Sequence, residues 1–171
     1  LGLIANTWAD IGRYEQALSA MYDALNADKT DSPTLKLQLA AILHKAKRET
    51  EFLSVMSEIE AAAQLTPDEQ RGYSDLLIAW SVRRADKERE RGNYPRAFAY
   101  LQKPLKDYPE HHGLMNALGR LFVSSGEYEE AYDLFKRVLA ADIESREARE
   151  GAIRAAVELG RSDEARTLAA D

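Results

Sequence analysis

A short pattern that recurs every 34 residues limits this chain to one kind of fold. A glycine, a polar residue, usually a tyrosine, two mostly polar residues and an alanine follow one another four times. The copies begin at Gly12, Gly92, Gly126 and Gly160. The alanines of the last three copies, Ala97, Ala131 and Ala165, are 34 residues apart. A period of roughly 20 to 50 residues is typical of chains that stack one structural unit, so the sequence predicts a repeat array.

The residues around each glycine predict an antiparallel pair of helices. Apolar residues recur at helical spacing on both sides of Gly126. Glycine readily adopts the left-handed conformation that ends one helix and turns the chain into the next. The small residues Gly119 and Ala131 let the two helices approach closely. Residues 111–125 and 127–141 are therefore predicted to form a helical hairpin, which buries its apolar faces only when neighbours stack on it.

These features resemble the tetratricopeptide repeat, whose small, aromatic, glycine, tyrosine, alanine and aromatic positions are matched along nearly the whole chain. The matching residues are Gly119, Phe122, Gly126, Tyr128, Ala131 and Phe135 in the fourth repeat, Ala5, Trp8, Gly12, Tyr14 and Ala17 in the first, and Gly92, Tyr94, Ala97, Gly160 and Ala165 elsewhere. The resemblance implies an all-α solenoid of antiparallel helical hairpins that winds into a right-handed superhelix.

The repeat pattern divides the chain into five parts. We expect a single array over residues 1–171, with repeats at about 1–31, 32–65, 66–110, 111–143 and 144–171. The first repeat lacks its expected beginning, and the fifth stops within its second helix. The chain is therefore predicted to be a fragment of a longer protein.

The second repeat departs from the pattern. Lys47, Glu49 and Phe52 stand where glycine, tyrosine and alanine are expected, so we interpret it as a degenerate repeat. The pattern by itself does not say whether its turn and its packing survive.

The third repeat begins with a long helix. A threonine, a proline and a glutamate at residues 66–69 have the spacing of a capping box, and no breaker except Gly72 precedes Gly92. The first helix of this repeat is therefore predicted to have about 24 residues. The irregular middle of the array predicts a hinge near residues 60–75, which would divide it into two rigid halves instead of one smooth superhelix.

Composition and charge exclude several classes of function. The chain has 29 acidic and 23 basic residues, and because they are interspersed, no basic stripe is available for nucleic acid. With no cysteine, the chain has no disulfide and no thiolate ligand. No apolar stretch is long enough to span a membrane, and the first residues lack the features of a signal peptide. We expect no nucleic-acid partner and no membrane insertion by this segment.

The sequence shows no constellation that would support catalysis. No nucleophile with a base, acid and base pair or phosphate-binding loop occurs at a usable spacing. His111 and His112 are adjacent, so their side chains diverge, and a solvated pair at a loop end is favoured over a zinc site. His44 lies on the polar side of its predicted helix and is expected at the surface. We predict no enzymatic activity, no cofactor and no metal.

The resemblance also implies a binding groove. In tetratricopeptide arrays the first helix of each repeat lines the concave surface. Carried over position by position, the family pattern predicts partner-binding residues Asn6, His44, Asp86, Arg89, Asn116, Arg120, Glu150 and Arg154. The lysine and asparagine pattern with which some members clamp a terminal carboxylate is absent. The arginines have two open interpretations, contact with a partner's carboxylate or sugar ring, and salt bridges between adjacent repeats.

A run of charged residues at 83–91 also has two interpretations. Opposite charges three and four residues apart favour a solvated helix face. The alternative is that part of this face lines the groove.

Part of the chain resembles one branch of the family. The long charged helix before Gly92-Asn93-Tyr94 and the Pro104-Leu105 pair inside the following helix are similar to the periplasmic repeat region of a family of cellulose synthase components that takes part in bacterial cellulose export. This resemblance implies a bacterial exopolysaccharide export protein whose repeats lie in the periplasm, and space and recruit the synthase and an outer-membrane pore. Its partners would be other proteins and polysaccharide. The alternative is a general adaptor, periplasmic or cytoplasmic, that binds a partner's peptide segment in its groove.

Overall fold

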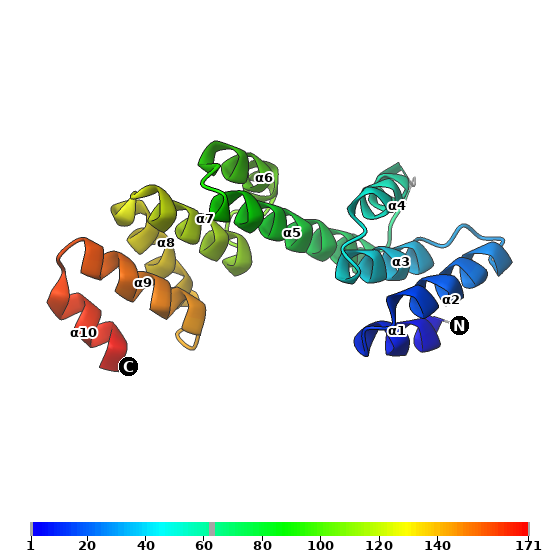
Figure 1. Ribbon diagram of the computed structural model, residues 1–171, viewed down its shortest axis with the longest axis horizontal. Coiled ribbons are helices and arrows are strands. Elements are labelled where there is room, and N and C mark those ends of the chain that lie inside the picture. Colours follow the sequence, from blue (N-terminus) through cyan, green and yellow to red (C-terminus); the bar gives the residue numbers. More distant parts are fainter. Residues whose placement is uncertain (1, 62–63, 171) are drawn as a thin grey trace. The chain divides into compact units, whose positions relative to one another are not determined.

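The computed structural model describes residues 2–61 and 64–170, which form ten α-helices and no strand (Figure 1). The helices are α1 (Gly2–Asp10), α2 (Tyr14–Ala27), α3 (Pro33–Lys45), α4 (Glu49–Ala61), α5 (Pro67–Glu90), α6 (Tyr94–Asp107), α7 (His112–Ser125), α8 (Tyr128–Ala141), α9 (Arg146–Glu158) and α10 (Ser162–Ala170). Consecutive helices pair as hairpins, from α1 with α2 to α9 with α10, and two or three residues join the two helices of each hairpin. The predicted all-α fold of helical hairpins is confirmed.

Glycine closes four of the five hairpin turns. The glycines of the repeat pattern all have φ between 74° and 88°: Gly12, Gly92, Gly126 and Gly160. After Gly126 the N–H of Glu127 donates to the carbonyl oxygen of Phe122 at 2.8 Å. This bond satisfies a carbonyl that the end of α7 would otherwise leave without a partner. The left-handed glycine thus both ends the first helix and directs the chain into the second.

The second repeat keeps its hairpin without a glycine. Lys47 adopts the left-handed conformation with φ of 60°, and the N–H of Arg48 donates to the Leu43 carbonyl oxygen at 3.0 Å. Phe52, which replaces the usual alanine, is fully buried between α3 and α4. The degenerate positions therefore preserve the turn and the packing, at the cost of a lysine in a conformation that disfavours side chains.

Replacing Lys47 with glycine is expected to stabilise the protein. The left-handed conformation costs a residue with a Cβ roughly 1–2 kcal/mol, and part of that gain is lost to the greater freedom of glycine in the unfolded chain. We expect the free energy of unfolding, measured by urea titration, to rise by about 0.5–1 kcal/mol. Lys47→Ala is the matched control, because it removes the same charge but keeps the Cβ. A Lys47→Gly protein no more stable than Lys47→Ala would contradict this account of the turn.

The helices group into two compact units, residues 1–77 and 78–171. The boundary lies within α5, and each unit is described by itself. The hinge expected near residues 60–75 stays a prediction, and residues 62 and 63 within it lie outside the described residues.

Helix α5 begins at the predicted capping box. The Thr66 N–H donates to Glu69 Oε2 at 2.9 Å, and the Glu69 N–H donates to Thr66 Oγ1 at 3.3 Å. The helix then continues for 24 residues without a break at Gly72. The predicted elongated helix is confirmed.

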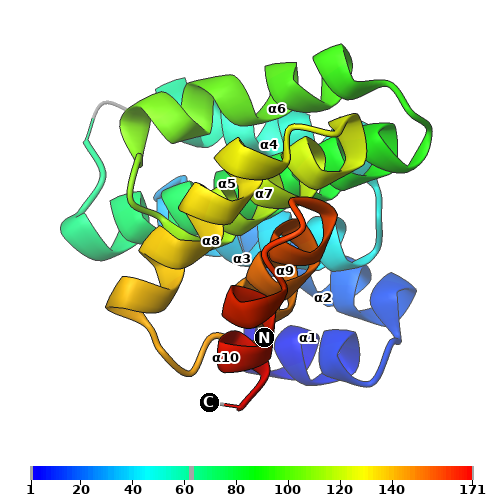
Figure 2. The ribbon, with the colours of Figure 1, turned by 90° about the vertical axis from the view of Figure 1, so that its left-hand side faces the viewer.

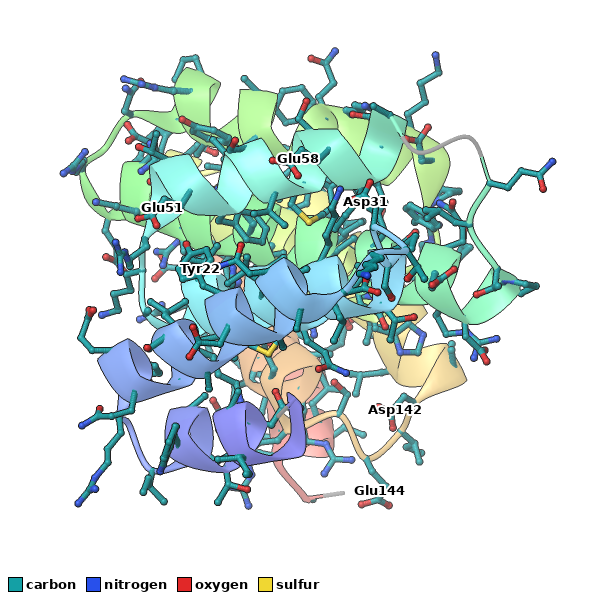
Figure 3. The ribbon with its side chains drawn as sticks, turned by 90° about the vertical axis from the view of Figure 1, so that its right-hand side faces the viewer. Tyr22, Asp31, Glu51, Glu58, Asp142 and Glu144 are labelled. Atoms are coloured by element: carbon teal, nitrogen blue, oxygen red, sulfur yellow. The ribbon has the colours of Figure 1, made fainter. Side chains whose placement is uncertain are left out.

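The first unit contains two helical hairpins. Helix α1 contacts α2 and α3, α2 contacts α3, and α3 contacts α4. Polar contacts support this packing (Figure 3): Tyr22 of α2 donates to Glu51 of α4 at 3.0 Å, and Lys36 of α3 pairs with Asp31 at 2.7 Å and Glu58 at 3.3 Å. The Lys36 side chain is mostly covered, so its ammonium holds the loop before α3 and the end of α4 together.

The second unit stacks successive helices around two apolar clusters. Helices α7, α8, α9 and α10 pack in order (Figure 2), and α7 also contacts α9. One cluster includes Ile78, Leu101 and Leu114, from α5, α6 and α7. The other centres on Phe135 of α8 and is otherwise formed largely by alanines. Small residues allow α9 to approach α8 closely, so the helices stack at short range.

Tyr132 links α8 to α10, the second helices of two neighbouring repeats. Its hydroxyl on α8 donates to Glu164 Oε2 on α10 at 2.5 Å, and the Arg161 guanidinium lies 5.2 Å from its ring centre. Burial, together with the hydrogen bond to Glu164, raises the pKa of Tyr132 from 10.0 to about 12.

The raised pKa makes the stability of this contact dependent on alkaline pH. A phenol that holds its proton more tightly in the folded state stabilises that state fully below pH 10. The stabilisation is lost as the pH rises toward about 12. In an ultraviolet titration Tyr132 should ionise later than an ordinary tyrosine, and Tyr132→Phe should remove that step. The pKa of Tyr22 is also raised, by burial and by its hydrogen bond to Glu51, and its titration should be the same in both proteins. An unchanged titration of the Tyr132→Phe protein, apart from the loss of an ordinary tyrosine, would contradict this assignment.

Candidate functional site

One guanidinium links the first helices of three repeats in the second unit. Arg120 of α7 donates to Asp86 of α5 through two bonds, Nε to Oδ1 at 3.1 Å and Nη2 to Oδ2 at 2.7 Å. Its Nη1 pairs with Glu147 of α9. The Arg120 and Asp86 side chains are 28% and 26% exposed, so water screens their charges only in part. Because two bonds to one carboxylate fix the guanidinium plane, Arg120 is held in one orientation.

Arg89 extends this network along α5. Its Nε donates to Asp86 Oδ1 at 3.2 Å, and its Nη1 donates to the Ser124 hydroxyl of α7 at 3.2 Å. Two of the three predicted groove arginines therefore have their charges matched within the protein. For Arg89 and Arg120 the structure favours the salt-bridge interpretation.

Asn116 lies one helical turn before Arg120 and is 5% exposed. Its Nδ2 donates to Glu147 Oε2 at 3.3 Å, whereas its Oδ1 has no hydrogen-bond partner among the described residues. A buried acceptor without a donor is costly, by about 1–3 kcal/mol. The unsatisfied acceptor is thus buried beside the ion-pair network, out of reach of a molecule at the surface.

A pocket of about 340 Å³ adjoins these residues. It is lined by Arg120, Phe135, Glu147, Glu150, Gly151 and Arg154. Glu150 and Arg154 are exposed and form no ion pair with any described residue. They lie four residues apart on α9, which places an acceptor and a donor on the same side of the helix. This face of α7 and α9 is the candidate site, and Arg154 is its available cation.

The structure places the other predicted groove residues elsewhere. Asn6 lies half-buried on α1 and His44 on α3, both in the first unit. The His44 ring packs against Phe52 with their centres 5.5 Å apart. His44 is therefore half-buried against Phe52, less exposed than the sequence predicts.

The charged run in α5 is only partly solvated. Glu88 is 2% exposed and accepts hydrogen bonds from Arg91 Nη1 at 3.3 Å and Asn93 Nδ2 at 3.2 Å. The favoured interpretation of this run as a solvated face is wrong at Glu88, which stabilises the α5–α6 turn. The burial of Glu88 depends on the position of α6. The spacing of charges along α5 therefore could not predict it.

Sequence reasoning also missed Glu147, Gly151 and the capping role of His111. The His111 Nδ1 accepts the Leu114 N–H at 3.4 Å, so the imidazole begins α7. One signal was present in the sequence: Asp86 and Arg120 have opposite charges and are 34 residues apart, which gives them the same place in successive repeats. Glu147 occupies a different place in its repeat, and the period therefore did not point to it.

Comparison with known families settles the fold family. The tetratricopeptide repeat family is matched by one model over residues 82–146 and by another over residues 122–171. Together these matches span residues 82–171, more than half of the chain. The chain is a tetratricopeptide repeat protein. Arrays of this repeat are typical of non-catalytic scaffolds that bind other proteins.

Relatives of this tetratricopeptide repeat protein include three named cellulose synthase operon protein C. The relative from Xanthomonas axonopodis pv. citri (strain 306) is 28% identical over 138 residues, which cover 81% of this chain and 9% of the relative. Those from Pseudomonas fluorescens (strain SBW25) and Komagataeibacter xylinus are 24% and 27% identical, and the matches cover 79% and 71% of this chain. The chain spans about a tenth of the length of each of the last two. It therefore resembles one segment of these proteins.

Solved structures show the same fold. A tetratricopeptide repeat protein from Parabacteroides merdae ATCC 43184 matches with a TM-score of 0.61 and 20% identity, over 96% of this chain and 60% of the other. MamA from AMB-1 matches with a TM-score of 0.58 and 18% identity, over 96% and 90% of the two chains. None of the helices in the described ranges combines the length and apolar character needed to cross a bilayer.

Proposed function

We propose that this chain is a non-catalytic scaffold segment of a bacterial machine that makes and exports cellulose or a related exopolysaccharide. The similarity of most of the chain to cellulose synthase operon protein C is the observation that supports this proposal. In this function the segment lies in the periplasm, where it spaces and recruits the synthase and an outer-membrane pore. Stacked repeats are suited to spacing because each contacts its neighbours at a regular interval.

The ion-pair network gives the spacer function a physical basis. Arg120 contacts the repeats before and after its own, and Arg89 contacts the repeat after its own. The charges of these arginines are therefore matched between consecutive repeats and are not available to a partner. A segment that holds the synthase and the pore at a set distance needs fixed angles between its repeats.

An exchange experiment tests this function. The matching segment of the Xanthomonas relative is replaced with residues 1–171, and exported cellulose is measured beside a strain in which the segment is deleted. We expect the exchange to restore export, and export as low as in the deletion strain would contradict the proposal. A second exchange, with an unrelated tetratricopeptide array of five repeats, separates the two parts of the function. Restored export would indicate spacing alone, and loss would indicate recruitment by this surface.

The alternative function is that of an adaptor that binds a partner's peptide segment on the face of α7 and α9. The exposed side chains of Glu150 and Arg154, which form no ion pair with a described residue, favour it. An extended peptide has both N–H donors and carbonyl acceptors, which these groups could bind.

Arg154→Ala distinguishes the two functions. Because Arg154 is exposed and forms no ion pair with a described residue, its removal should change the free energy of unfolding by less than about 0.5 kcal/mol. A spacer would export normally with this change. An adaptor should bind its peptide more weakly by about 1–3 kcal/mol, measured by calorimetry, if Arg154 makes a charged contact.

A further inference from the structure

A pocket of about 520 Å³ lies where the start of α6 meets the end of α7. Its lining includes the rings of Tyr94, Phe98 and Phe122, together with Leu121, Ser125 and Glu127. All of these residues belong to the second unit, and neither end of the chain borders the pocket. This aromatic pocket shares no residue with the candidate site on α7 and α9.

The equivalent junction one repeat later, between α8 and α9, is covered by the chain's own side chains. Tyr132 lies 34 residues after Phe98 and is 7% exposed. Its hydroxyl donates to Glu164, and the Arg161 guanidinium lies over its ring. At the earlier junction the place of Arg161 is taken by Glu127, and phenylalanine has no hydroxyl. Phe98 is 41% exposed as a result, and an aromatic surface is left open inside the array.

The lining of the aromatic pocket combines ring surfaces with hydrogen-bond acceptors. No lysine, arginine or histidine lines it among the described residues. Ser125 Oγ donates to Glu127 Oε1 at 2.9 Å, and Glu127 forms no ion pair with a described residue. Its Oε2 therefore stays available as an acceptor. A fitting ligand has an apolar face edged by hydrogen-bond donors and carries no negative charge.

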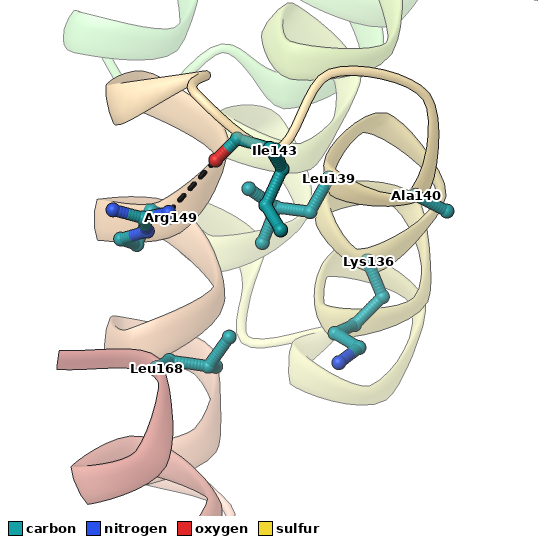
Figure 4. Close-up of a pocket in the computed structure, with 6 residues that line it drawn as sticks. All are labelled: Lys136, Leu139, Ala140, Ile143, Arg149 and Leu168. Atoms are coloured by element: carbon teal, nitrogen blue, oxygen red, sulfur yellow. Dashed lines mark hydrogen bonds between the residues drawn. The ribbon is translucent and has the colours of Figure 1, made fainter. Parts of the chain in front are cut away.

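A second pocket in this unit, between α8, α9 and α10, has a different character (Figure 4). Its volume is about 180 Å³, and the aliphatic side chains of Leu139, Ile143 and Leu168 line it together with Lys136 and Arg149. None of its described lining residues is aromatic. Pockets for drug-sized ligands have volumes of roughly 300–1,000 Å³, a range that includes the aromatic pocket and excludes this one. The aromatic pocket is therefore the one suited to a ring-shaped ligand.

We propose that the aromatic pocket binds a short stretch of neutral β-1,4-linked glucan, which packs on Phe98 and Phe122 and donates hydroxyl groups to Glu127. In this polymer all ring substituents are equatorial, so hydroxyls surround each ring and both ring faces present only C–H groups. Such faces bury well against aromatic side chains, and the hydroxyls form charge-assisted bonds to a carboxylate. A polymer of uronic acids would instead bring negative charge beside Glu127. The inference rests on the proposed function, in which the exported polymer is such a glucan.

Oligosaccharide binding to the 171-residue chain tests the proposal, with ¹⁵N NMR to locate it. The probes are cellopentaose, maltopentaose and the peptide acetyl-Gly-Leu-Lys-Leu-Gly-amide, whose lysine also suits Glu127. We expect cellopentaose to shift amide signals in residues 94–98 and 121–127. Maltopentaose should bind at least about fivefold more weakly, because its α-1,4 linkages turn successive rings away from a common plane. The peptide should bind more weakly than cellopentaose.

Variants separate the ring and the carboxylate from the fold. Phe98→Ala should weaken cellopentaose binding at least about fivefold, and Glu127→Gln about threefold. Leu53→Ala is the matched control, since Leu53 on α4 is 40% exposed and does not line the pocket.

A double variant should close the aromatic pocket without lowering stability. Phe98→Tyr with Glu127→Arg reproduces the residues of the later junction, because Glu130 already occupies the place of Glu164. We expect this variant to bind cellopentaose at least about tenfold more weakly, with an unchanged unfolding midpoint. Binding as strong as that of the original chain would overturn the assignment of the pocket.

Four other results would also overturn the proposal. They are no shift at about 10 mM cellopentaose, equal binding of the two oligosaccharides, shifts centred on Glu150 and Arg154, and stronger binding of the peptide at the same signals. None of them would contradict the proposed function, because a spacer that does not touch the polymer still restores export in the exchange experiment. A failed exchange would contradict the proposed function whether or not cellopentaose binds.

Discussion

Replacing Gly119 with alanine should lower the free energy of unfolding by about 2 kcal/mol, and replacing it with leucine by about 3 kcal/mol or more. A Cβ at Gly119 would lie 2.6 Å from Phe135 Cζ, far inside van der Waals contact. Phe135 cannot move aside, because on its other side a Cβ at Gly151 would lie 2.4 Å from the same atom. The ring is thus held between the backbones of α7 and α9. Urea unfolding measures the loss.

Two further variants separate this contact from general effects of glycine in helices. Gly72→Ala in α5 would place its Cβ 3.6 Å from Leu37, an ordinary contact, so it should stabilise by about 0.5–1 kcal/mol. In a Phe135→Leu background the smaller side chain leaves room, and Gly119→Ala should then cost less than about 1 kcal/mol. An unfolding midpoint for Gly119→Ala at or above that of the original protein would show that α7 and α8 are not packed through this ring.

Replacing Arg120 with alanine should destabilise the second unit by about 2 kcal/mol. This magnitude lies between the small contribution of a fully exposed pair and the loss from breaking a buried one. Asp86 and Glu147, whose side chains are 26% and 50% exposed, would lose their shared partner, and Asp86 would keep only its bond to Arg89 among the described residues. Arg120→Lys should recover only part of the loss, because an ammonium cannot make the two parallel bonds to Asp86.

The cost of Arg120→Ala should depend on Asp86. In an Asp86→Asn background Arg120 no longer has a paired carboxylate on α5 to lose, so the double-mutant cycle should give a coupling of about 1–2 kcal/mol. Arg154→Ala serves as the control, since Arg154 belongs to the same face and has no ion pair with a described residue. Additive effects of Arg120→Ala and Asp86→Asn would mean that the bidentate pair contributes nothing to stability.

Much of the fold could be predicted because the repeat pattern acts locally. Gly126 and its equivalents mark turns that only a left-handed residue can make, and the capping box at Thr66 and Glu69 fixes the start of α5 through bonds between neighbours in sequence. The second repeat was harder to interpret. A lysine can take the place of glycine when tertiary packing, here around Phe52, outweighs the local cost.

The candidate site was predicted in part. Asp86 and Arg120 occupy equivalent positions in successive repeats, and they form an ion pair. His44 also occupies a predicted groove position, but its ring contacts Phe52. Whether a polar side chain faces a groove or a neighbouring helix depends on the size of residues on the facing helix. The two interpretations of the arginines could not be separated from the sequence for the same reason.

The sequence by itself determined the helical hairpins, their order and their turns, because these follow from contacts within about one repeat length. Tertiary structure alone decided which charges are matched between repeats. Arg120 meets Glu147 only because Gly119 and Gly151 allow α7 and α9 to approach the Phe135 ring.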